Sequence, residues 1–276
     1  LPLASVPGAR IADVLETEPS IRDPQQPQRF AEPFDGTVEF RRVSFRYPGA
    51  EADVLHDLDF VARPGQTTAF IGSTGSGKST LINLIPRFYD VTEGAILVNG
   101  IDIREVTQHD LRAKIGYMPQ TATLFSGTIE SNLRYGDETA SPDDLALAAD
   151  IAQASGFIAE KSEGMAAEIA QGGANVSGGQ RQRLSIARAL VKKAPIYIFD
   201  DSFSGLDFKT DAALRRALKK QTGSSTVLIV TQRISTVMNA EQIIVLDEGR
   251  IVGKGTHSEL LADCEVYREI ATSQLG

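Results

Sequence analysis

Residues 72–80 have the sequence GSTGSGKST, which combines three glycines with a lysine and several hydroxyl side chains. In this spacing the glycine backbone amides surround phosphate groups, Lys78 reaches the outer phosphates and the Ser79 hydroxyl binds Mg²⁺. A glycine-rich turn before a helix is the plain alternative, but the strand-like run before the motif and the helix-like run after it favour a phosphate site. The residues predicted to hold a nucleotide are Ser73, Thr74, Gly75, Ser76, Gly77, Lys78, Ser79 and Thr80.

Two adjacent carboxylates follow the apolar run IYIF at residues 196–199. Asp200, at the end of this strand-like run, is predicted to hold Mg²⁺ directly or from the second coordination sphere. An acid at a strand end is common, so the prediction depends on the glycine loop as well. The role of the next residue, Asp201, decides whether the chain cleaves its nucleotide or mainly holds it.

A second candidate anion site begins within NVSGGQRQRLSIARAL at residues 175–190. Ser177 is a helix N-cap residue, and Gly178 and Gly179 leave the first backbone amides uncovered at the positive end of the helix dipole. A capped amphipathic helix that only packs is the alternative. Two phosphate-binding helix starts far apart in one chain indicate that each serves a different nucleotide, or that two copies face one another.

The elements that position these residues follow an α/β pattern. Residues 37–47 and 54–60 alternate apolar and polar side chains, which predicts antiparallel strands early in the chain. Later strands alternate with helical stretches such as 207–220, which predicts a parallel sheet with right-handed crossovers. These later strands are expected at residues 196–200, 226–230 and 242–246.

Residues from about 121 to 190 have a helical pattern throughout, which predicts a helical insertion in the α/β core. Within it, Ser141 is the expected N-cap of a helix with Pro142 at its first position. Near the end of the chain, we expect a short capped helix and a final helix with Val266 and Ile270 packed on one face.

The composition is that of an ordinary globular chain of 276 residues, with 42% hydrophobic and 23% charged residues. Its apolar runs are shorter than the roughly 20 residues of a membrane helix. The net charge of −8 argues against a nucleic-acid-binding surface. The single Cys264 excludes an internal disulfide and fits a reducing compartment. The three histidines lack metal-ligand spacing.

The first 35 residues differ from the rest of the chain. Residues 8–16 place Ile11, Val14 and Leu15 on one helical face, and the proline-rich stretch that follows predicts an extended linker. The chain starts without methionine, so we expect these residues to lead in from a preceding part of a longer protein.

Together, five motifs resemble those of the nucleotide-binding domain of ABC transporters of the exporter type. They are GSTGSGKST, YMPQ at 117–120, VSGGQ at 176–180, IYIFDD at 196–201 and SGLD at 204–207. Their order and spacing match the family from about residue 36 to the end. The resemblance implies an α/β P-loop NTPase (RecA-like) fold, with a parallel sheet core, an N-terminal antiparallel β subdomain and a helical insertion subdomain. It also implies ATP and Mg²⁺ as cofactors.

The resemblance assigns roles to further residues. Tyr47 would stack on adenine, and Gln120 would reach Mg²⁺ and the attacking water. Ser177, Gly178, Gly179 and Gln180 would contact ATP bound to a partner domain in a head-to-tail pair. Taken singly, each has a plain structural alternative, such as a rim aromatic for Tyr47 or a turn residue for Gln120.

The resemblance also implies partners and a location. Residues 124–133 would face the coupling helices of a transmembrane domain. Residues 1–35 would be the linker from that domain, residues 36–276 the ATP-binding domain, and about 121–190 its helical subdomain. The expected location is the cytoplasmic face of the cell membrane.

Three positions depart from the family pattern. Asp201 stands where a glutamate polarises the attacking water, and the shorter side chain withdraws the carboxylate by roughly 1 Å, a misplacement that can cost about a hundredfold in rate. Gln232 stands where the family has a histidine, and an amide cannot carry the charge or shuttle the proton of an imidazole. Gln171 stands where the family usually has a glutamate, just before the signature motif VSGGQ at 176–180.

These departures suggest one half of a heterodimeric exporter, the half with a degenerate site. Its own site would hold ATP and cleave it slowly, while its intact signature completes the site of a partner with Glu and His at the two altered positions. A soluble ABC ATPase outside transport is an alternative, but neither heptad arms nor a second cassette is present. A purely regulatory ATP-binding subunit is another, whereas a simple P-loop kinase or GTPase would lack the second anion helix.

Overall fold

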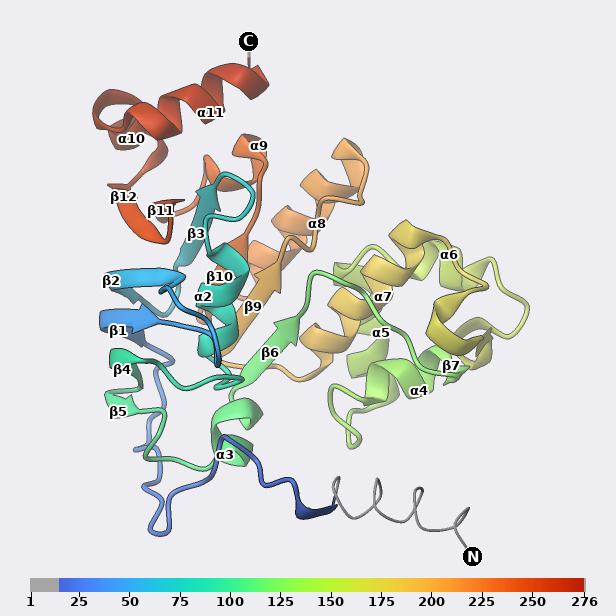
Figure 1. The fold of residues 1–276 in the computed structure, drawn as a ribbon. Helices are drawn as coiled ribbons and strands as arrows, with labels where there is room; N and C mark the ends of the chain where they lie inside the picture. Colours follow the sequence, from blue (N-terminus) through green and yellow to red (C-terminus); the bar gives the residue numbers. More distant parts are fainter. Residues whose placement is uncertain (1–14, 276) are drawn as a thin grey trace, which may run out of the picture.

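The computed structural model describes residues 15–275, and its core is a six-stranded sheet that is parallel except at one edge (Figure 1). In spatial order the strands are β12 (Arg250–Gly255), β11 (Gln242–Asp247), β3 (Thr67–Gly72), β10 (Thr226–Val230), β9 (Ile196–Asp200) and β6 (Ile115–Met118). The predicted parallel sheet is confirmed. The antiparallel edge strand β12 was not predicted, because its alternately exposed residues have little apolar patterning.

The carboxyl ends of the central strands lie at one edge of this sheet. Val230 at the end of β10 pairs with Asp200 at the end of β9, and Leu246 of β11 pairs with Gly72 at the end of β3. Every residue of β9 and β10 is buried, as in a sheet covered on both faces. This register places the glycine loop that follows β3 close to the aspartates at the end of β9.

A four-stranded antiparallel sheet forms the N-terminal part and confirms the early strands. In spatial order its strands are β2 (Leu55–Ala62), β1 (Val38–Phe45), β4 (Glu93–Val98) and β5 (Ile101–Asp102). The rings of Phe40 and Phe60 stack across the β1–β2 pair with centroids 4.5 Å apart, and Phe60 also meets Phe70 of the parallel sheet. One apolar core therefore joins the two sheets.

Six helices of the described chain pack around these sheets (Figure 1). They are α2 (Lys78–Leu84), α3 (Gln108–Ala113), α8 (Phe208–Gln221), α9 (Ile234–Val237), α10 (His257–Asp263) and α11 (Glu265–Leu275). Asp207 caps α8 by accepting a bond from Thr210, and Thr256 caps α10. Val266 and Ile270 of α11 pack, as expected, against a core cluster that includes Ile71 of β3 and Val245 of β11. No described helix is long and apolar enough to cross a bilayer.

The predicted helical insertion forms a lobe beside β6 (Figure 1). Its elements are β7 (Gly127–Thr128), α4 (Ile129–Arg134), α5 (Pro142–Ile151), α6 (Ser155–Ala159), η1 (Gly164–Ala166), β8 (Glu168–Ile169), η2 (Gln171–Gly173) and α7 (Gly178–Val191). The Ser141 cap and Pro142 are confirmed at the start of α5. The prediction of helix throughout is wrong where β7 pairs with β8, because a two-residue strand is too short to show a periodicity.

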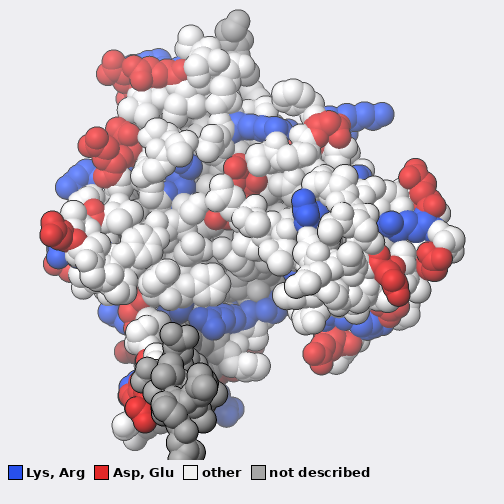
Figure 2. Space-filling model, turned by 45° about the vertical axis from the view of Figure 1, so that its right-hand side comes forward, with Lys and Arg blue, Asp and Glu red and all other residues white. Residues whose placement is uncertain are grey.

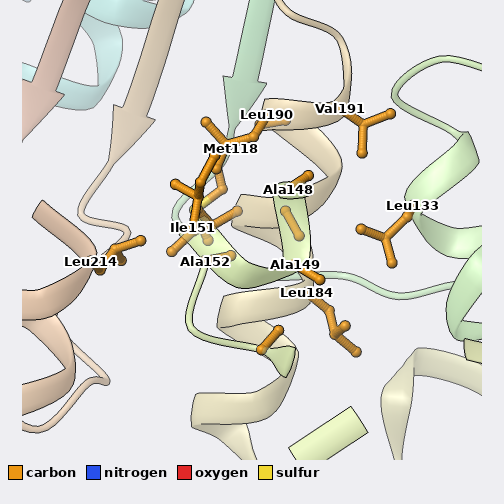
Figure 3. Packing of buried hydrophobic residues seen from close by; sticks show 14 of the residues in the cluster. Met118, Leu133, Ala148, Ala149, Ile151, Ala152, Leu184, Leu190, Val191 and Leu214 are labelled. Carbon is orange, nitrogen blue, oxygen red and sulfur yellow. The ribbon is translucent and has the colours of Figure 1, made fainter. Parts of the chain in front are cut away.

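The lobe and the sheet share a continuous core. Figure 3 shows Leu184 of α7 and Ala149 of α5 facing each other, with Met118 of β6 and Leu214 of α8 at the side nearer the sheet. Met118, Ala149 and Leu214 are fully buried, and Leu184 nearly so. Small residues on α5 allow this close approach to α7. The start of α7 is thereby held in a fixed place relative to β6 and α8.

The predicted helix at residues 8–16 lies outside the described residues except for its last two positions, which are helical. Residues 17–35 contain no helix or strand, which agrees with the predicted linker. This segment is attached to the domain, since the Gln28 amide donates to the Glu105 carbonyl at 2.7 Å and the Lys114 ammonium lies 4.8 Å from the Phe34 ring centroid.

The turn between β11 and β12 contacts the glycine loop. Its central residues Glu248 and Gly249 have φ of 43° and 73°, as a two-residue type I′ hairpin turn requires. The Gly249 amide donates to the Ser76 carbonyl at 3.1 Å. A Cβ atom on Gly249 would collide with the Val54 carbonyl. The hairpin therefore supports the loop only with glycine at this position.

We predict that Gly249→Ala weakens MgATP binding and lowers stability, because the collision pushes the turn from the glycine loop. Gly100→Ala is the matched control, since Asn99 and Gly100 form the same kind of turn at φ of 50° and 80° with open space around Gly100. Both alanines should cost about 1–2 kcal/mol for the left-handed backbone. Only Gly249→Ala should lose a further amount of unfolding free energy, about 1–3 kcal/mol, because its added methyl group is overpacked. Urea unfolding and calorimetric titration with MgATP measure both effects, and equal losses in the two variants would contradict the prediction.

Candidate functional site at the strand ends

A cavity of about 250 Å³ lies at the carboxyl ends of β3, β9 and β10. It contains residues from four predicted motifs: the glycine loop, the YMPQ segment, the second aspartate and the segment after β10. The lining residues are Val54, Thr74, Gly75, Gly77, Lys78, Ser79, Thr80, Gln120, Asp201, Val230 and Gln232. Positions up to 178 residues apart in the chain, Val54 and Gln232, therefore meet in one site.

Lys78 is the buried cation of this site. Its ammonium donates to the carbonyls of Gly72 and Ser73 at 2.9 and 2.7 Å and to the Ser76 hydroxyl at 3.2 Å. Burial lowers the pKa of Lys78, and the nearby charges of Asp201 and Asp200 oppose this shift. The loop thus fixes a positive charge at the cavity wall, where it can meet the outer phosphates of a nucleotide.

Two glycines give the loop its shape. Gly75 and Gly77 have φ of 84° and 98°, which other residues rarely adopt. A Cβ atom on Gly77 would also lie 2.7 Å from the Leu55 side chain. Helix α2 begins directly after Gly77, so its free backbone amides face the same cavity as Lys78.

Asp200 and Ser79 form the predicted metal-binding pair. The Ser79 hydroxyl donates to Asp200 Oδ1 at 3.0 Å. Asp200 is only 3% exposed, and burial raises its pKa, while the Ser79 bond acts in the opposite direction. A serine hydroxyl, an aspartate and the Gln120 amide oxygen are hard oxygen donors of the kind Mg²⁺ prefers, so these residues fit that ion. Among the described residues there is no cluster of three His, Cys, Asp or Glu that could hold a metal without a nucleotide.

Asp201 lines the cavity next to Asp200. Its φ is 45°, a left-handed conformation that aspartate tolerates, and its amide donates to the Val230 carbonyl at 2.8 Å. Burial raises the pKa of Asp201, while the Ser204 hydroxyl, Arg233 and Lys78 oppose this shift. The backbone therefore directs this carboxylate into the cavity.

Two residues that position the segment around Gln232 were not predicted from the sequence. Arg233 donates to the Ser204 and Leu206 carbonyls at 2.6 and 3.3 Å, which connects this segment to the loop after β9. Gln274 of α11 donates to the Gln232 carbonyl at 2.6 Å and accepts from the Ile234 amide at 2.9 Å. Arg233 follows Gln232 directly and could have been noticed as a cation beside the motif, whereas no local signal indicates Gln274.

Tyr47 lies beside the cavity and does not line it. Its hydroxyl is 2.9 Å from the Thr80 hydroxyl, and its ring meets the Phe45 and Tyr89 rings edge to face. Tyr117 is a further aromatic near the site, and burial, together with the charge of Asp200, raises its pKa to about 12. It remains a neutral donor to Asn83 at 2.7 Å. Ring stacking of Tyr47 on adenine stays a prediction.

The second anion motif does not join this cavity. Ser177 caps α7, its hydroxyl accepts from the Gln180 amide at 3.2 Å, and the Gln180 side chain accepts from the Ser177 amide at 3.1 Å. Ser177 and Gly178 are exposed, and a Cβ atom on Gly178 would meet nothing within 4 Å. The predicted cap is confirmed, and none of Ser177, Gly178, Gly179 and Gln180 lines the chain's own nucleotide cavity.

Comparison with known proteins identifies relatives of the whole chain. A sequence model of the ABC transporter family matches residues 55–204. An uncharacterized ABC transporter ATP-binding protein of Mycobacterium tuberculosis is 50% identical over 99% of the chain and 47% of its own length. An ATP-dependent lipid A-core flippase of Pseudomonas aeruginosa is 43% identical over 85% of the chain and 39% of its own length.

A solved structure agrees with these relatives. The structure of a bacterial Atm1-family ABC exporter with ATP bound has a TM-score of 0.92 and 35% identity, and the match covers 98% of the chain and 47% of that protein. The chain thus spans about half the length of the curated relatives and of this structure. The comparison confirms the predicted α/β P-loop NTPase fold.

We predict that Asp200→Asn raises thermal stability in metal-free buffer. The raised pKa of Asp200 means that the folded chain binds its proton more tightly, so wild-type stability falls as pH rises from about 4. The asparagine variant lacks this loss, and its advantage should grow with pH and then level off. Thermal melts between pH 4 and 8 measure it.

Asp211→Asn is the control for this prediction, because Asp211 is also fully buried but forms an ion pair with Arg215 at 3.1 Å. Its loss should destabilise the fold by leaving Arg215 unpaired. An Asp200→Asn variant that is less stable than wild type at pH 8 would contradict the assignment.

Proposed function

Because this chain belongs to the ABC transporter family, we propose that it is the ATP-binding domain of an exporter and that its own ATP site cleaves slowly. Relatives with exporter functions support this proposal, including the lipid A-core flippase and the Atm1-family exporter. One observation gives the main support for slow cleavage. Asp201 and Gln232 line the same cavity as Lys78, so both departures from the family pattern fall at the predicted place of water activation.

The residues predicted to bind MgATP are all present, and each would contact a different part of the nucleotide or the metal ion. Lys78 and the backbone amides of the glycine loop would contact the phosphates. Ser79, Asp200 and Gln120 would hold Mg²⁺, which neutralises phosphate charge and orients the terminal phosphate group. Tyr47 would contact the adenine from the rim. Thr74 and Thr80 line the cavity and could add hydroxyl donors to the phosphates.

Slow cleavage follows from what Asp201 and Gln232 can do. The Asp201 carboxylate is one methylene shorter than a glutamate, and its left-handed backbone is fixed by the bond to Val230, so the chain cannot easily move it outward. The Gln232 amide can donate a hydrogen bond but cannot accept and release a proton. The site would therefore bind the terminal phosphate and leave the attacking water poorly activated.

The signature motif would act on a second ATP-binding domain. Ser177, Gly178, Gly179 and Gln180 lie at the uncovered start of α7, outside the chain's own cavity, where a partner's ATP can approach. A partner with Glu and His at the altered positions would have a fast site completed by this motif. The heterodimer accounts for an intact signature together with an altered catalytic pair. A purely regulatory subunit would not need that signature.

A second surface supports docking of a transmembrane domain. A cavity of about 210 Å³ between the sheet and the helical lobe is lined by Phe88, Tyr117, Tyr135, Arg112 and Arg188 among others. The exposed fractions of Phe88 and Tyr135 are 41% and 63%, which is unusual for aromatic side chains. Residues 124–133 lie along the same lobe and include Phe125, whose ring contacts that of Tyr135. Coupling helices of an exporter would fit this groove.

The domain boundaries and the location follow from this assignment. Residues 1–35 would connect to the transmembrane domain, residues 36–276 form the ATP-binding domain, and the domain would lie at the cytoplasmic face of the membrane. Nucleic acid is not an expected partner. Figure 2 shows Lys and Arg in small groups interspersed with Asp and Glu on one face, and the net charge is −8.

We predict that the double change Asp201→Glu and Gln232→His raises ATP turnover by the purified chain about a hundredfold, because it restores both water activation and the phosphate contact. The double variant has complete sites in both copies of a homodimer. Each single change should raise turnover only a few-fold, since the other lesion remains. Steady-state phosphate release at saturating MgATP measures the rates.

Gly179→Glu added to the double variant is the control, because a carboxylate at the start of α7 repels the partner's ATP. Turnover should return to the wild-type level while MgATP binding is kept. Full activity from Asp201→Glu alone would refute the two-lesion explanation, and brisk turnover by the wild-type chain would refute the slow site.

A further inference from the structure

A second cavity, of about 510 Å³, lies between α8, α9 and β10 and has a volume typical of small-molecule sites. Val227 and Ile229 of β10 line this cavity, whereas Val230 lines the nucleotide cavity. Side chains alternate between the two faces of a strand, so the two cavities lie on opposite faces of β10. Helix α9, which forms part of the second cavity, begins two residues after Gln232.

Thr236, a residue of the cavity wall, has a buried hydroxyl without a partner in the described part of the chain. Thr236 of α9 is 6% exposed, and its Oγ1 atom forms no hydrogen bond with any described residue. An unsatisfied buried hydroxyl costs about 1–3 kcal/mol, so such groups usually have a partner in the working protein. Rotation of the Thr236 side chain toward the cavity would let a ligand oxygen supply it.

The charged side chains that line the cavity are all basic. Arg215, Arg216 and Lys219 of α8 line it, and no aspartate or glutamate does. Arg215 is neutralised by Asp211, and Lys219 pairs with Glu241 at 2.9 Å. Arg216 forms no ion pair in the part of the chain that the structure describes. One uncompensated guanidinium therefore lies at the mouth of a cavity with an apolar wall.

We propose that this cavity is a binding site for a small organic carboxylate with an apolar body. Arg216 would hold the carboxylate, because a guanidinium matches its geometry with two parallel hydrogen bonds. The Thr236 side chain rotates toward the cavity, and its hydroxyl donates to a ligand oxygen. The apolar body packs on Val227, Ile229 and Leu218, which have no polar atoms to satisfy. An inorganic anion would leave the apolar wall exposed to water. A neutral apolar compound would leave Arg216 and Thr236 without a partner.

The test is titration calorimetry of the 276-residue chain with three probes: sodium octanoate, 1-octanol and inorganic phosphate. Octanoate should bind with one site per chain and at least about tenfold more tightly than either other probe, a difference of about 1.4 kcal/mol. Octanol binding as tightly as octanoate would overturn the proposal, because the site would then select only apolar surface. Phosphate binding as tightly would overturn it too, because the site would then select only charge.

Variants locate the ligand. Arg216→Glu should weaken octanoate binding at least about tenfold, whereas Lys220→Glu, the same charge change on an exposed α8 residue outside the lining, should leave affinity within about twofold. Thr236→Val removes the hydroxyl with little change in shape and should weaken binding several-fold without lowering the melting temperature. Equal effects of Arg216→Glu and Lys220→Glu, or unchanged binding in Thr236→Val, would show that octanoate binds elsewhere.

Discussion

The buried ammonium of Lys78 is the interaction on which the nucleotide site depends. Three oxygen atoms of its own loop hold it, and the buried Asp200 and the half-buried Asp201 lie near enough to influence its pKa. Burial disfavours the charged form of all three groups, so the fold places them together at a cost in stability. Phosphates and Mg²⁺ are the ligands that such an arrangement favours. Sites of this kind are stabilised by what they bind.

Strand β10 lies between the two cavities and leads into the segment that contains Gln232. Its even-numbered residues face the core under the glycine loop, and Val227 and Ile229 face α8. Gln232 and Arg233 follow β10. Gln274 of the last helix donates a hydrogen bond to the Gln232 carbonyl, and Arg233 donates one to the Ser204 carbonyl in the loop after β9. The position of the Gln232 side chain therefore depends on elements from three parts of the chain. A small shift of α9 or α11 would therefore move Gln232 in the nucleotide cavity.

Much of this structure could be predicted from the sequence, because its signals are local. The glycine loop, the strand ending at Asp200 and the caps at Ser141 and Ser177 each depend on residues within a few positions of one another. The contact of the Gly249 turn with Ser76, the β7–β8 pair and the Gln274 contact could not be predicted. They depend on contacts between distant segments, and a two-residue strand or a single amide leaves no periodic pattern. The motifs indicated which residues meet, and the structure adds what holds them there.

We infer that this chain holds MgATP firmly and cleaves it slowly. The most direct measurement is a single-turnover experiment, in which excess purified chain is mixed with radiolabelled ATP and Mg²⁺ and the bound nucleotide is recovered over time. If the chain holds MgATP in this way, the label stays bound and is recovered mainly as ATP after many minutes. Rapid recovery as ADP, or failure to retain the label, would contradict it.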